Sequence, residues 1–171
     1  MDSNKDRAEH AAYNADTKTA DLILALGQEH IRAQQASSIA LDSRCTQVAA
    51  IQMSALALAL AFIAGGKATE VASIMIALAA AFFMFGTMAA FHAILSGYQK
   101  LPGVPPCWWF KAEEASPTLK AAKCWAAGEA QHSIDFNNEI NERKGDTLNR
   151  SIHLAAVGVL FAFLAVIAQL A

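Results

Sequence analysis

The sequence predicts an all-α membrane protein, with three transmembrane helices and long cytoplasmic helices in an oligomeric bundle. Its 171 residues are 55% hydrophobic and 16% charged, whereas soluble domains carry about 25% charged residues. Charged residues are missing from three long blocks, a pattern typical of helices that cross a membrane. The basic residues lie almost entirely in the segments on one side of these blocks, as the positive-inside rule requires.

Residues 1–44 are expected to form an N-terminal cytoplasmic segment with a long helix. The segment is polar and carries both signs of charge, without the apolar stretch of a cleavable signal peptide. Asp16 or Thr17 is a suitable N-cap, and no proline follows before Pro102. We therefore expect helix from about Thr17 into the first transmembrane helix, projecting from the membrane as a rod. The alternative, an amphipathic helix flat on the bilayer, is less favoured because basic residues are few.

Two transmembrane helices joined by a short turn are expected next. Residues 45–66 contain no charged residue, and helix of this length measures about 33 Å, enough for a hydrocarbon core of about 30 Å. Residues 67–70 are expected to be a short external turn, which Gly65 and Gly66 make possible through their conformational freedom. Residues 71–97 form the second uncharged stretch and are expected to be transmembrane helix 2.

Residues 98–150 are expected to be a cytoplasmic loop followed by helices. The first part holds all four prolines of the chain and is therefore expected to be a loop. Trp108 and Trp109 are interpreted as an interface anchor at the level of the lipid headgroups. The alternative is that they form an aromatic plug between the cytoplasmic helices.

The remainder of this segment is expected to be helical and to lead into the last transmembrane helix, residues 151–171. Ser116 and Pro117 suit an N-cap and the first helical position. One helix or two fit the pattern, because Gly128 and Gly145 weaken helix at two points. The helices of the two cytoplasmic segments are expected to pack beside each other.

The distribution of basic residues predicts the orientation. Only Lys67, in the short turn, lies outside the two segments 1–44 and 98–150, although the chain has 13 lysines and arginines. This asymmetry predicts that the N-terminus is cytoplasmic and the C-terminus external in a multi-pass protein.

No enzyme signature is found in the sequence. A glycine loop for phosphates, a nucleophile elbow and the spacing of a metal site are all missing. We therefore expect a protein that is not an enzyme, with no catalytic residues, metal ligands or cofactors. A net charge of -2 does not favour nucleic acid binding, and the three cysteines do not indicate a disulfide framework.

Polar residues within the apolar blocks are the candidates for lining or gating a pore. Three helices cannot enclose an aqueous pore, so conduction would require an oligomer, with the first transmembrane helix nearest the axis. Two alternatives stay open: Gln52 joins helices by hydrogen bonds, and the histidines are neutral groups bonded near the interface. The candidates are Gln47, Gln52, Ser54, Thr87, His92 and His153.

Six basic residues of the cytoplasmic segments are candidate contacts for an anionic ligand. The alternative is that they only reflect the positive-inside rule. They are Arg32, Arg44, Lys120, Lys123, Arg143 and Lys144.

Two stretches carry a resemblance to known families. "NADTKTADLILAL" resembles the opening motif of the Pycsar-effector-like transmembrane domain, and "NNEINERKGDTLNRSIHLAAVGVLF" resembles its closing helix. The layout is similar to that of the SLATT family and the Hailong membrane effector, which are small bacterial anti-phage proteins. The resemblance implies an inner-membrane effector that senses a nucleotide signal from a partner nucleotidyltransferase, opens in the bacterial plasma membrane and arrests the infected cell.

The leading hypothesis is therefore a channel-like effector of abortive infection. Its expected partners are the lipid bilayer, further copies of itself in a homo-oligomer such as a tetramer, and a nucleotide or oligonucleotide signal. Two alternatives remain: a non-conducting membrane anchor or scaffold for a soluble partner, and a holin-like permeabilising toxin.

Overall fold

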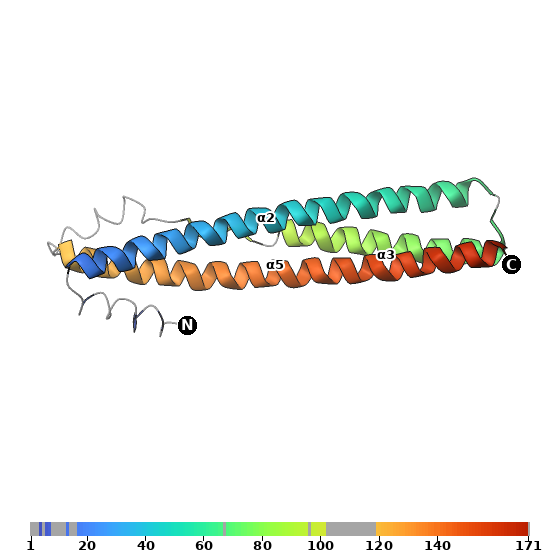
Figure 1. Cartoon of the computed structure of the whole chain (residues 1–171). Helices are drawn as coiled ribbons and strands as arrows, with labels where there is room; N and C mark the ends of the chain where they lie inside the picture. Colours follow the sequence, from blue (N-terminus) through green and yellow to red (C-terminus); the bar gives the residue numbers. More distant parts are fainter. Residues whose placement is uncertain are drawn as a thin grey trace. The chain divides into compact units, whose positions relative to one another are not determined.

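The structure is a computed structural model that describes residues 4, 6, 7, 13, 17–66, 68–95, 97–101 and 119–170. Within these ranges it is helical without strands, which confirms the predicted all-α class. The three helices are α2 (Thr17–Ala64), α3 (Glu70–Leu95) and α5 (Leu119–Leu170) (Figure 1). The predictions for Trp108, Trp109, Ser116 and Pro117 fall outside the described residues.

The chain divides into two compact units, which are described separately. Unit 1 comprises Met1–Ser38 and Tyr98–Asn141, and unit 2 comprises Ile39–Gly97 and Glu142–Ala171. Segments that lie far apart in the sequence therefore meet in each unit. Helices α2 and α5 both contribute to the two units, whereas α3 belongs to unit 2 alone.

All three helices are long and apolar enough to cross a membrane. Large apolar side chains on each of them face outward in unit 2, among them Leu58, Met88 and Phe163. Water would solvate this surface poorly, whereas lipid chains would cover it at no such cost. These observations support a membrane protein.

Helix α2 confirms the predicted unbroken helix from Thr17. Proline is missing from its 48 residues, so each amide can take part in the helical hydrogen bonds. Gly27, its one interior glycine, is where α2 approaches α5 in unit 1. A Cβ atom there would lie 3.2 Å from Cβ of Ala130.

Helix α5 is a single helix of 52 residues. Of the two arrangements that the sequence allowed, one helix is therefore correct. Gly128 and Gly145 lie within it and do not interrupt it. A glycine costs a helix only about 1 kcal/mol relative to alanine. A cost of this size does not end the helix at either position.

The turn between α2 and α3 is closed by its glycines and by a threonine cap. Gly66 has φ of 62°, the left-handed conformation that ends many helices, and its N–H donates to Ile63 O at 3.1 Å. Thr69 caps α3, because its Oγ1 accepts the N–H of Ala72 at 3.3 Å. The N–H of Thr69 donates to Oε1 of Gln169 at 2.9 Å, which ties the turn to the end of α5.

Small residues form the buried face of α3 in unit 2. They include Ala72, Ala79, Gly86 and Ala90, and they allow the neighbouring helices to approach closely. The interface with α5 also holds aromatic rings. Phe82 and Phe161 stack with ring centroids 5.5 Å apart, and Phe83 lies against Gly158.

Helices α2 and α5 pack beside each other in unit 1, as expected for the helices of the two polar segments (Figure 1). Ile23 of α2 packs against Cys124 and Ala127 of α5. At the edge of this contact, Lys123 forms an ion pair of 2.6 Å with Asp21.

Candidate functional site

A polar cluster of three side chains lies buried among the apolar helices of unit 2. The polar cluster consists of Gln52 from α2, Thr87 from α3 and Ser151 from α5, each at most 5% exposed. Gln52 Nε2 donates to Ser151 O at 3.1 Å and to Ser151 Oγ at 3.2 Å. The single hydroxyl proton of Thr87 is within reach of two acceptors, Phe83 O at 2.9 Å and Gln52 Oε1 at 3.4 Å. The polar cluster therefore connects all three helices.

Gly86 makes room for the polar cluster. Ser151 Oγ donates to Gly86 O at 2.8 Å, so the α3 backbone takes part directly. A Cβ atom on Gly86 would lie 2.6 Å from Gln52 Oε1, a distance that real contacts do not show. Gly86 and Ser151 were not among the predicted site residues. A glycine inside an apolar helix, followed at once by a hydroxyl residue, was the available signal.

The structure places the six pore-lining candidates in two different environments. Gln52 and Thr87 are buried between helices of one chain, in agreement with the alternative that Gln52 joins helices. A water-facing role for either would require these helices to separate. Gln47 and Ser54 are exposed on α2. Ser54 Oγ donates to Ala50 O at 2.9 Å, and Gln47 Nε2 donates to Ser43 Oγ at 3.4 Å.

The two candidate histidines, His92 and His153, are exposed. His153 Nδ1 donates to Asn149 O at 2.7 Å, so this ring is held by its own helix. His153 also lines an open hollow of ≈ 760 Å³ together with Asp146 and Arg150. Both signs of charge lie in this hollow, so it does not select for an anion.

The structure divides the candidate basic residues between its two units. Arg32 and Lys123 belong to unit 1, where Lys123 is paired with Asp21, and the side chain of Lys120 lies outside the described residues. Arg44 and Arg143 are exposed in unit 2. These five residues and Lys144 stay candidates for contacts with an anion.

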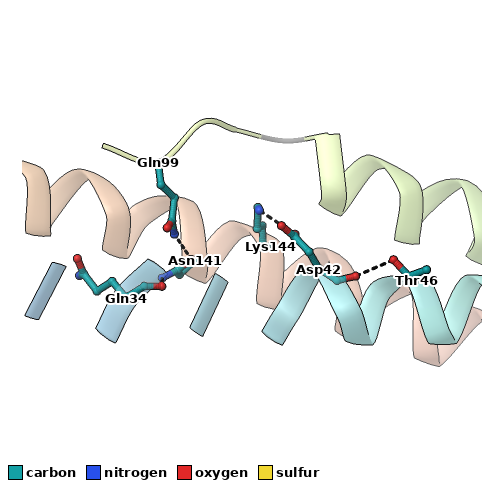
Figure 2. A network of polar contacts seen from close by, with 6 residues as sticks. All are labelled: Gln34, Asp42, Thr46, Gln99, Asn141 and Lys144. Carbon is teal, nitrogen blue, oxygen red and sulfur yellow. Dashed lines mark hydrogen bonds and ion pairs between the residues drawn. The ribbon is translucent and has the colours of Figure 1, made fainter. Parts of the chain in front are cut away.

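Lys144, the sixth candidate, is buried in unit 2. Its side chain is 3% exposed, and Nζ donates to Asp42 Oδ1 at 2.8 Å (Figure 2). The backbone of Asp42 also accepts a hydrogen bond within α2. Thr46 Oγ1 donates to Asp42 O at 2.9 Å. Burial and the pair with Asp42 make this ammonium group poorly accessible to an anionic ligand.

Replacing Asp42 by alanine is expected to destabilise unit 2 by about 1–3 kcal/mol, because the buried Lys144 ammonium loses its counter-charge. The measurement is unfolding in detergent followed by circular dichroism. Asp21→Ala is the matched control, since its pair with Lys123 is more exposed and should contribute only about 0.5 kcal/mol. Equal effects of the two substitutions would contradict this assignment.

A second polar group lies in unit 1, where Gln34 of α2 bonds to two asparagines of α5. Gln34 Nε2 donates to Asn138 Oδ1 at 2.7 Å and to Ile134 O at 3.0 Å. Asn141 Nδ2 donates to Gln34 O at 3.2 Å. The sequence signal was the pair of runs "QQ" and "NNEIN"; the second was used only for the family resemblance, and the two were not predicted to meet. In the ranges that the structure describes, no group of three or more His, Cys, Asp or Glu residues is arranged to hold a metal.

Comparison with models of protein families, with curated proteins and with solved structures finds no match to this chain.

Proposed function

We propose that this protein is a membrane effector that assembles into a channel-like homo-oligomer and breaches the bacterial inner membrane in anti-phage defence. One observation carries the proposal: an outward face of α2 in unit 2 is built from small and weakly polar residues. This α2 face follows steps of four and three residues, the spacing of a helix that packs along another helix. Its members, all exposed, are Ser43, Gln47, Ala50, Ser54, Ala57 and Ala61.

The α2 face differs from the surface around it. Large apolar residues flank it on both sides, including Ile51, Met53, Leu58 and Leu60, and all are exposed. Large residues suit contact with lipid chains, whereas small residues allow two helices to approach closely. Close approach through the α2 face supports self-association. The large flanking residues would pack around this contact.

An assembly around the α2 face would supply the pore that one chain lacks. Three helices cannot enclose water, but several copies with this face toward a common axis would place Gln47 and Ser54 along it. In this arrangement Gln52 and Thr87 keep each protomer together. The tetramer, the nucleotide trigger and the cytoplasmic N-terminus rest on the sequence resemblance and on the distribution of basic residues.

Ion flux from liposomes is the direct test. Purified wild-type protein should release a trapped ion, while Ala57→Leu should lower this flux about tenfold or more, because a bulky side chain separates the packed helices. Ala77→Leu is the matched control, since Ala77 is exposed on α3 away from the α2 face. It should leave both flux and oligomer size unchanged.

Three results would contradict the proposal. A folded oligomer that never conducts would favour the non-conducting scaffold. A monomer in detergent and in lipid would remove the assembly altogether. Equal loss of flux in Ala57→Leu and Ala77→Leu would show that the α2 face has no special part in the assembly.

A further inference from the structure

Residues 98–101 form an extended strap that lies along the α2–α5 pair of unit 1. Three side chains hold it. Gln35 Nε2 donates to Lys100 O at 3.3 Å, and Gln99 Nε2 donates to Asn141 Oδ1 at 2.7 Å. Figure 2 shows Gln99 reaching from the strap to Asn141 on α5. The third holding residue is Asn137.

Both polar atoms of the Asn137 side chain bind the backbone of the strap. The N–H of Lys100 donates to Asn137 Oδ1 at 2.8 Å, and Asn137 Nδ2 donates to Lys100 O at 3.1 Å. Asn137 is 0% exposed, and both of its bonds to the strap are therefore shielded from water. One carboxamide thus satisfies both backbone groups of one residue, as a neighbouring strand would in a sheet.

Hydrogen bonds, not buried apolar side chains, hold the strap in place. Tyr98 and Leu101, its two large side chains, are 96% and 74% exposed. Lys100 adds a polar contact, with Nζ 5.1 Å from the centroid of the Phe136 ring. Each hydrogen bond of the strap replaces a hydrogen bond to water, so its net contribution to the free energy of docking is small. An attachment of this kind releases more easily than one anchored by a buried aromatic ring.

The strap is also the direct continuation of α3. Helix α3 ends at Leu95, and the strap begins at Tyr98, so only two residues separate them. A link of two residues limits how far the strap can move without pulling on the end of the helix, because a chain spans at most about 3.3–3.6 Å per residue. The strap therefore joins the polar helix pair of unit 1 to a helix that is apolar enough to cross a membrane.

We propose that the strap is a latch, and that its release from Asn137 is the conformational step that frees α3 to open the assembly. This inference rests on the proposed function and adds its regulation. Release and docking are two states of one short segment, as in other order–disorder switches. A trigger that binds unit 1 with the strap released would shift the protein toward the open state.

The test uses full-length protein in liposomes, with Asn137→Ala as the latch variant and Asn138→Ala as its matched control. Asn138 is the neighbouring carboxamide on α5, and its bond goes to Gln34 instead of the strap. Hydrogen exchange of residues 98–101 and of 91–95 at the end of α3 is measured together with basal ion flux. Circular dichroism checks that both variants keep their helices.

Asn137→Ala should raise exchange in the strap and at the end of α3, and raise basal flux, each by about tenfold, the effect of losing one or two hydrogen bonds. Asn138→Ala should change none of these. A reducible cross-link between Gln99→Cys and Asn141→Cys, with the native cysteines replaced by alanine, should hold flux at its basal level. Cleavage of the cross-link by a reductant should then raise the flux.

The outcomes separate the latch from the channel. If the strap stays protected in Asn137→Ala, or opens without any change at the end of α3 or in flux, the latch is wrong and the strap is only a structural tie. If strap and α3 respond as expected but wild type and variant both fail to conduct, the latch stands and the proposed channel falls.

Discussion

Replacing Gln52 by leucine is expected to lower the free energy of unfolding of unit 2 by about 2 kcal/mol. The carboxamide donates to Ser151 of α5 and accepts from Thr87 of α3, so one substitution weakens two helix contacts at once. Leucine fills a similar volume but leaves Ser151 and Thr87 without that partner in an apolar interior. The measurement is unfolding in mixed detergent micelles followed by circular dichroism.

Gln47→Leu is the matched control for this experiment. Gln47 lies on the same helix, is exposed, and bonds only to Ser43 of α2. Its substitution should change the free energy of unfolding by no more than about 0.5 kcal/mol, as for most surface positions. If both glutamine variants unfold alike, the polar cluster does not stabilise the helix contacts in the way argued here.

Alanine at Gly158 is expected to destabilise unit 2 by about 1–3 kcal/mol, because the interface with α3 has no room for a methyl group. A Cβ atom there would lie 2.9 Å from Cε1 and 3.1 Å from Cδ1 of Phe83, whose ring is itself buried. Either the ring or the two helices must shift to make room for the methyl group. Thermal unfolding in detergent measures the loss.

Two further variants make this prediction specific. Gly145→Ala, at a position of α5 with nothing within 4 Å of the new Cβ atom, should instead stabilise the protein by about 0.5–1 kcal/mol through its helix propensity. Phe83→Leu combined with Gly158→Ala should recover part of the loss, because the smaller side chain makes room. A stabilising effect of Gly158→Ala, or the absence of any rescue, would contradict the close approach of α3 and α5.

The helices could be predicted because each depends on a local property of the chain. Long stretches without charge indicate segments for which lipid is a suitable solvent, and α3 lies within one of them. The lack of proline after Thr17 predicted that α2 continues without a break. The continuity of α5 through Gly128 and Gly145 was left open, because the packing that compensates for a glycine comes from other helices.

The candidate site could be predicted only in part. Gln47 and Gln52 are the same residue type in the same apolar helix, and both were reasonable pore-lining candidates. Five positions turn a helix by about 140°, so the two side chains leave α2 in different directions. Gln52 enters the polar cluster and Gln47 faces outward, a difference set by which side of α2 receives α3 and α5.

The amino-acid sequence by itself determined the number of helices apolar enough to cross a membrane and the continuity of α2. Each of these follows from composition and local propensity, which act over a few turns of chain. Only the tertiary structure decided that Asp42 pairs with Lys144 and that Asn137 holds the backbone of Lys100. Such pairs depend on the register in which whole helices pack, and many different registers satisfy the same apolar pattern.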